Sequence, residues 1–135
     1  MKRLSILIVL IFIIGVILYL WPQKQTTSPT LGNQHWTIDF QFSESEINST
    51  SFASPQPLNL AAITKLLSQR ENWEYQFDDY GDLGIIVTQI KDKKNGEDQK
   101  YWQYFVDNEQ PQVSVDKYFP ANNAHIIWKF IKSEL

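Results

Sequence analysis

The longest apolar segment of this chain lies at its start. From Leu4 to Trp21 there is no charged residue, and Ser5 is the only small polar one. As a helix, these eighteen residues would be about 27 Å long, close to the roughly 30 Å hydrocarbon core of a bilayer. The pattern predicts an N-terminal transmembrane signal-anchor over residues 1–22.

The charges that flank this segment predict its orientation. Lys2 and Arg3 precede it, and only Lys24 closely follows it. The positive-inside rule therefore places the N-terminus in the cytoplasm and the rest of the chain outside the cell membrane, as a single-pass protein. A cleaved signal peptide is the alternative, although residues 17–27 contain no cleavage site of the A-x-A kind.

After a polar linker over residues 23–34, the pattern becomes that of a folded domain, predicted for residues 35–135. The stretch WTIDFQF alternates with the period of a strand, so its four apolar side chains share one face: Trp36, Ile38, Phe40 and Phe42. The next residues, 43–57, are mostly polar and predict a loop. Helical spacing then appears within residues 58–72, with Asn59 as the expected N-cap.

Further strands are expected over residues 73–77, 85–90, 101–106 and 125–131, because these stretches are rich in aromatic and β-branched residues. Turn residues separate them, including Asn95-Gly96. The order of elements is a strand, a helix and then several strands. It predicts a small α+β domain in which one helix packs on a mostly antiparallel sheet.

Charge and composition exclude several kinds of chemistry. Beyond Lys2 and Arg3, the chain has ten Lys and Arg against fifteen Asp and Glu, which argues against nucleic-acid binding. It has no cysteine, and His35 and His125 are far apart in sequence. Neither a metal site nor a catalytic constellation is therefore indicated, and the acidic turn at Asp78 lacks the spacing of a calcium loop. We expect no enzyme and no cofactor.

The C-terminal third carries aromatic residues in a more specific arrangement. A strand begins with Tyr-Trp-Gln-Tyr at residues 101–104, Tyr118 and Pro120 precede a second turn, and Ile126, Trp128 and Phe130 alternate in the last strand. This arrangement resembles the C-terminal β-domain of the cobalamin carriers transcobalamin and intrinsic factor, and the uncharacterised bacterial domains related to it. The resemblance covers nearly all of the predicted domain. It implies a β-grasp-like fold.

Two turns depart from the bacterial pattern. Asn108-Glu109 stands where Asn-Gly is frequent, and Asn123-Ala124 where Gly-Asp is frequent. Because Asn tolerates a left-handed backbone, Asn108, Asn122 and Asn123 are expected to preserve the turns.

The resemblance also implies a ligand. In the vertebrate carriers, a corrinoid lies between this β-domain and a larger helical domain, which this chain does not contain. On the strand from 101 to 106, alternate side chains point to opposite faces, so one set packs on the helix and the other remains available to a ligand. The expected ligand-binding residues, drawn from both faces, are Tyr101, Trp102, Gln103, Tyr104 and Tyr118.

Three hypotheses for function follow. The first is a membrane-anchored extracytoplasmic binding module for a corrinoid or another small ligand, acting with a partner that completes the site. The second is a surface protein-protein interaction or assembly domain whose exposed aromatic side chains bind an envelope protein. The third is an enzyme of unrecognised chemistry.

Overall fold

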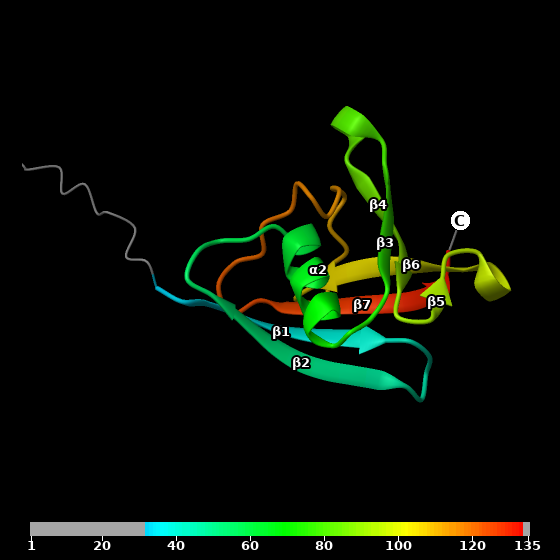
Figure 1. The fold of residues 1–135 in the computed structure, drawn as a ribbon, viewed down its shortest axis with the longest axis horizontal. Coiled ribbons are helices and arrows are strands. Elements are labelled where there is room, and N and C mark those ends of the chain that lie inside the picture. The colour runs from blue at the N-terminus through cyan, green and yellow to red at the C-terminus, as the bar shows by residue number, and fades with distance from the viewer. Residues whose placement is uncertain (1–31, 134–135) are drawn as a thin grey trace, which may run out of the picture. The chain divides into compact units, whose positions relative to one another are not determined.

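The computed structural model describes residues 32–133 (Figure 1). The predicted signal-anchor and most of the predicted linker lie outside the described residues. Within the described part of the chain, no helix is long and apolar enough to cross a membrane.

The largest element of the fold is a four-stranded sheet in the order β2-β1-β7-β6. Strands β1 (Gln34–Gln41) and β7 (His125–Lys132) lie at its centre and run parallel. The outer strands, β2 (Ile47–Ser54) and β6 (Lys100–Val106), pair antiparallel with their neighbours. The first and last strands of the domain are thus hydrogen-bonded to each other.

Helix α2 (Leu60–Arg70) lies over one face of this sheet (Figure 1). The predicted cap is confirmed, because the Asn59 side chain accepts a hydrogen bond from the Ala62 amide at 2.8 Å. Leu60, Ile63 and Leu67 are fully buried against the sheet. At about 25 cal/mol per Å² of apolar surface, each contributes roughly 1.5–3 kcal/mol to folding.

The alternation predicted for β1 is also confirmed. Trp36, Ile38 and Phe40 of the strand, with Phe42 just after it, are at most 2% exposed and face α2. Edge-on ring pairs join this row to its neighbours, such as the Phe40 and Trp73 rings at 5.3 Å. The apolar core therefore lies between α2 and one face of the sheet.

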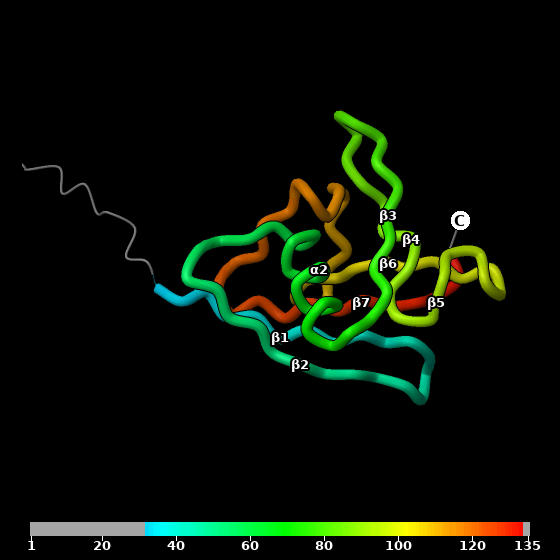
Figure 2. Tube along the Cα trace, in the orientation of Figure 1, coloured from blue at the N-terminus to red at the C-terminus, as the bar shows by residue number. Residues whose placement is uncertain are grey.

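The chain forms a second sheet where a single one was predicted. Strands β3 (Tyr75–Asp79), β4 (Ile85–Ile90) and β5 (Lys93–Lys94) pair in that order and antiparallel. A register shift between Gln76 and Phe77 interrupts the β3-β4 pairing. β3 and β4 are joined by the short 3₁₀ turn Gly81–Leu83, and this hairpin projects away from the four-stranded sheet (Figure 2). Over residues 32–133, the fold is a small α+β domain with one α-helix and mostly antiparallel sheets.

The loop predicted for residues 43–57 is wrong, because eight of its residues form β2. The strand lies at the sheet edge, so most of its side chains are exposed and apolar alternation is absent apart from Phe52, which packs against the core. Arg70 of α2 reaches over this edge and donates to the Ser51 carbonyl at 3.0 Å. A charged side chain at an otherwise uncharged edge strand hinders pairing with another chain.

The expected role of asparagine in the turns is confirmed at two positions. Asn108 has φ 69° and Asn123 has φ 65°, both in the left-handed region. Asn122 has no positive φ; its side chain instead accepts a hydrogen bond from the His35 amide at 2.8 Å. The side chain of Asn122 thus ties the loop before β7 to the start of β1.

Candidate functional site

An apolar cleft of about 220 Å³ lies between the β3-β4 hairpin and the core-facing side of β6 and β7. Its floor comes from the four-stranded sheet and its walls from the hairpin and from the loop before Tyr118. None of the lining residues is charged. The cleft is lined by Leu83, Ile85, Ile86, Val87, Trp102, Tyr104, Val113, Ser114, Val115 and Trp128.

Three aromatic rings make the floor. The Trp128 ring centroid lies 6.3 Å from that of Trp102 and 5.7 Å from that of Tyr104. Their polar atoms are already bonded within the protein: the Trp102 indole donates to the Lys93 carbonyl at 2.9 Å and the Tyr104 hydroxyl to the Val113 carbonyl at 2.6 Å. The floor therefore offers a small area of ring surface rather than free hydrogen-bonding groups, because Trp102, Tyr104 and Trp128 are 6%, 8% and 1% exposed.

The protonation of the floor follows from its burial. Burial raises the pKa of Tyr104 to about 12, with a smaller contribution from the neighbouring Tyr118. The hydroxyl is thus neutral at physiological pH and remains a donor to Val113. No charge develops on the floor of the cleft under these conditions.

A polar clasp holds the hairpin wall in place. The Ile85 amide donates to the Ser114 hydroxyl at 2.9 Å and to the Asp116 carboxylate at 3.2 Å. The Ser114 hydroxyl lies within hydrogen-bonding distance of both the Ile85 carbonyl and the Asp116 carboxylate. The clasp joins β4 to the loop 31 residues further along the chain and so fixes one wall relative to the other.

Replacing Asp116 with asparagine tests the clasp. The hydrogen bond from Ser114 holds the pKa of Asp116 below its ordinary 3.8, with further lowering by the Ile85 amide. A depressed carboxyl pKa stabilises the fold above the unfolded pKa and loses that stability as pH falls through the folded pKa. We expect urea midpoints of the parent chain to decline below pH 3.8 by more than those of Asp116→Asn; equal declines would show that the carboxylate contributes nothing.

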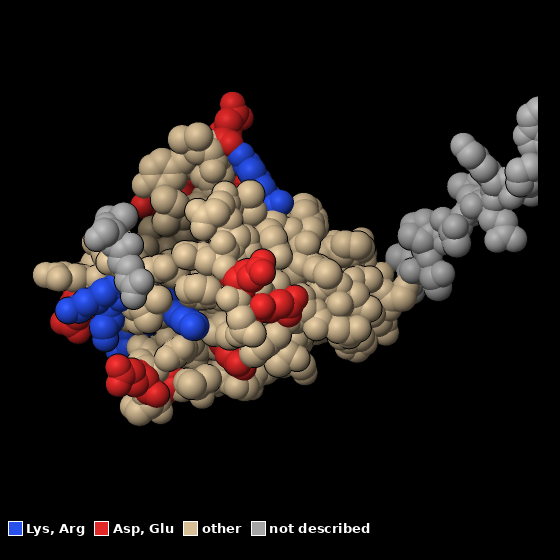
Figure 3. Space-filling view, turned by 180° about the vertical axis from the view of Figure 1, so that it is seen from behind, with Lys and Arg blue, Asp and Glu red and all other residues tan. Residues whose placement is uncertain are grey.

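The hairpin, residues 74–90, also presents apolar side chains to solvent. Phe77, Tyr80, Leu83 and Ile86 are 44%, 53%, 83% and 53% exposed. Residues 74–90 also include four carboxylates and no Lys or Arg. Seen from behind, the projecting end of the hairpin carries acidic groups with a basic side chain beside them (Figure 3), and the Lys117 ammonium donates to the Asp82 carbonyl there. Phe77 pairs with Val87 and Asp78 with Ile86, so the side chains of Phe77 and Ile86 emerge on opposite faces of the hairpin and both faces expose apolar surface.

The structure separates the predicted ligand-binding residues into two groups. Trp102 and Tyr104, 6% and 8% exposed, lie in the cleft floor, and Tyr118 packs against Tyr104 with ring centroids 5.8 Å apart. Tyr101 and Gln103 point to the opposite face of the sheet, where Tyr101 is 44% exposed. The five residues therefore do not form one continuous surface.

Sequence reasoning missed the walls of the cleft. Leu83 lies within an acidic turn, and Val113 and Ser114 lie in a segment that has no periodicity. The only local signal was Leu83, an apolar residue in the turn Gly81–Gly84. An apolar side chain is unexpected in an exposed turn and could have indicated a binding surface.

His125 lies beside a carboxylate on the four-stranded sheet. The His125 ring nitrogen is 2.7 Å from the Asp39 carboxylate, on the central strands and away from the cleft. Among residues 32–133, no group of three or more His, Cys, Asp or Glu side chains is placed to hold a metal ion.

The four-stranded sheet, helix α2 and the apolar cleft define the class, a small α+β domain with a concave apolar surface. The chain belongs to the family described as domain of unknown function, DUF4430, whose family model matches residues 60–132. No curated protein sequence matches it.

Solved structures that share the fold include the following two. One is a candidate metal-binding protein from Ruminococcus gnavus ATCC 29149, with a TM-score of 0.59 and 16% identity over 74% of this chain and 98% of that one. The other is haptocorrin in complex with Cbi, with a TM-score of 0.55 and 13% identity over 72% of this chain but 25% of haptocorrin. The predicted similarity in fold to a transcobalamin-like domain is thus confirmed, and the matched part of this chain spans a quarter of haptocorrin.

Proposed function

We propose that the chain is a membrane-anchored extracytoplasmic binding module without enzymatic activity, and that its cleft binds the flat, mostly apolar face of a small ligand such as a corrinoid. The observation that carries this proposal is the cleft itself: three aromatic rings at its floor, apolar walls and no charged lining residue. Flat amphipathic rings favour planar ligands with an apolar face.

The size of the cleft indicates that this chain contributes only part of the site. Its volume of about 220 Å³ is below the roughly 300–1,000 Å³ of pockets that enclose a drug-sized ligand. A corrinoid is larger than such a ligand, so the cleft would cover one portion of it. A partner, in this proposal an envelope protein, would cover the rest.

The proposal also includes the arrangement of the domain and its location at the cell membrane. The central parallel pair β1 and β7, with α2 on one face, supports a β-grasp-like arrangement of the domain. The signal-anchor over residues 1–22 would hold the domain on the outer side of the cell membrane, and the linker would separate it from the bilayer. This topology gives the cleft access to ligands outside the cell.

Titration with cobinamide tests the ligand. We expect quenching of tryptophan fluorescence in the full chain, purified in a non-ionic detergent, because Trp102 and Trp128 line the cleft. Leu83→Ser removes an 83% exposed wall residue without opening the core, and it should weaken binding by about three- to tenfold, since loss of a buried leucine contact is worth roughly 1 kcal/mol.

Leu66→Ser is the matched control, since Leu66 is 41% exposed on α2 and does not line the cleft. Its affinity should equal that of the parent chain. Absence of any quenching by cobinamide, or equal weakening in both leucine variants, would contradict binding of the corrinoid in the cleft.

The exposed hairpin favours a second candidate, an assembly domain that binds another envelope protein without a small ligand. Four exposed apolar side chains project there among carboxylates. The same pair of variants separates the two candidates. If cobinamide does not bind, while Leu83→Ser but not Leu66→Ser abolishes cross-links to one defined envelope protein in cells, the assembly function replaces the first.

A further inference from the structure

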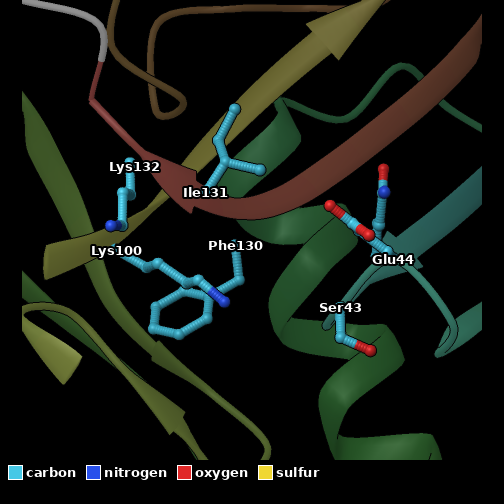
Figure 4. Close-up of a pocket in the computed structure, with 7 residues that line it drawn as sticks. Ser43, Glu44, Lys100, Phe130, Ile131 and Lys132 are labelled. Atoms are coloured by element: carbon cyan, nitrogen blue, oxygen red, sulfur yellow. The ribbon is translucent and has the colours of Figure 1, made fainter. Parts of the chain in front are cut away.

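A second hollow, of about 280 Å³, lies where β6 begins and β7 ends, and we name it the end hollow. It shares no residue with the cleft. Side chains of opposite charge and an aromatic ring line it. The lining residues are Gln41, Ser43, Glu44, Lys100, Phe130, Ile131 and Lys132 (Figure 4).

Two lysines lie side by side at this hollow. Lys100 and Lys132 are directly opposed partners on the antiparallel strands β6 and β7, so their side chains emerge on the same face. Neither lysine is within 4.0 Å of a carboxylate among residues 32–133. Like charges directly opposite on adjacent strands destabilise a sheet, and a bound carboxylate would relieve that repulsion.

A carboxylate lies across the hollow from the lysines. Glu44 belongs to the turn between β1 and β2, and this turn is held by the Ser43 hydroxyl, which accepts a hydrogen bond from the Glu46 amide at 3.0 Å. In Figure 4, Glu44 and Lys100 lie on opposite sides of the hollow, and the Phe130 ring lies beside Lys100. The hollow thus presents positive charge, apolar surface and negative charge in one small space.

We propose that the end hollow binds a small zwitterion of the α-amino acid type. The ligand carboxylate would bind Lys100 and Lys132, its ammonium group would bind Glu44, and an apolar side chain would lie against Phe130. A simple anion would be attracted by the two lysines but repelled by the Glu44 carboxylate. A simple cation would face two ammonium groups.

The volume agrees with this ligand class. At about 280 Å³, the hollow is smaller than the roughly 300–1,000 Å³ typical of drug-sized ligands, and a single amino acid is correspondingly smaller than such a ligand. Because the side chains that bind charge are partly exposed, we expect weak affinity, with a Kd of about 1 mM. The site would serve to sense or retain an abundant metabolite.

Leucine is the probe, and two of its derivatives are the chemical controls. In amide NMR spectra of the isotope-labelled full chain in non-ionic detergent, leucine at up to about 10 mM, tenfold above the expected Kd, should shift the Glu44 and Lys132 signals. N-acetylleucine lacks the ammonium and leucinamide lacks the carboxylate, so each should bind at least about tenfold more weakly. Absence of shifts with leucine, or equal binding of the three compounds, would overturn the proposal.

Three variants locate the site on the protein. Lys100→Gln, Lys132→Gln and Glu44→Gln should each weaken leucine binding by about tenfold. Lys94→Gln, on β5 and outside the end hollow, makes the same change of charge as the two lysine variants and should leave affinity unchanged. Equal weakening by Lys94→Gln would show a response to net charge alone and would contradict the site. Cobinamide quenching in these variants should equal that of the parent chain, so failure of one site is distinguishable from failure of the other.

Discussion

Replacing Gly84 with alanine is expected to destabilise the domain by about 2–6 kcal/mol, as the sum of two costs of roughly 1–3 kcal/mol each. Gly84 has φ 95° and ψ −163°, a region that only glycine adopts readily. A Cβ at this position would overlap Ser114 and come within 2.7 Å of the Asp116 carboxylate. The substitution therefore strains the backbone and opens the clasp together.

Urea unfolding, followed by tryptophan fluorescence, measures this loss. Gly81→Ala is the matched control, because Gly81 also has a positive φ, 62°, but no atom lies within 4 Å of the Cβ it would gain. It should cost only about 1–2 kcal/mol for the left-handed backbone. Equal losses in the two variants would mean that close approach of Ser114 to Gly84 contributes nothing. The clasp would then not determine the position of the hairpin.

The parts of the fold that sequence predicts well are those with a local physical cause. Trp36, Ile38 and Phe40 alternate because a strand buried on one face requires it, and the structure buries all three. Asn59 caps α2 because its short side chain reaches the amide three residues on. Each of these outcomes is decided by residues close together in the chain.

Strand β2 was not predicted because its conformation depends on pairing with β1 rather than on its own sequence. Its sequence, INSTSFAS, is mostly small and polar, and its backbone becomes a strand through pairing with β1. An edge strand has little need of apolar side chains, so alternation disappears. The division into two sheets was not predicted for a related reason. The residue types of β3 and β4 predict strands, but they do not indicate which sheet each strand joins.

The candidate site was predictable only in part. The residues predicted on β6 came from both faces of the strand, and the structure places Trp102 and Tyr104, but not Tyr101 and Gln103, in the cleft. The clasp joins Ile85 to Ser114 across 29 residues, and no periodicity marks such a contact. The end hollow likewise depends on the register that sets Lys100 against Lys132, which only the paired strands reveal.

Replacing Trp128 with alanine should produce the largest loss of stability among single core changes at the cleft, about 3–5 kcal/mol. Trp128 is 1% exposed, and its indole donates to the Thr64 hydroxyl at 3.0 Å, which in turn donates to the Leu60 carbonyl at 2.8 Å. The ring therefore connects the floor of the cleft with α2. Alanine would remove the ring and leave a cavity in the core.

Thermal and urea unfolding measure this loss, and two variants separate its causes. Trp128→Phe keeps a ring but removes the indole N–H, and Thr64→Val removes its acceptor, so each should cost only about 1–3 kcal/mol. A loss in Trp128→Ala no larger than that in Thr64→Val would assign the stabilisation to the hydrogen bond rather than to packing. Because domains of this size have total stabilities of roughly 5–15 kcal/mol, the expected loss in Trp128→Ala is a large fraction of the whole. The aromatic floor that would bind a ligand is therefore also a main support of the fold, and variants that test binding belong on the walls of the cleft.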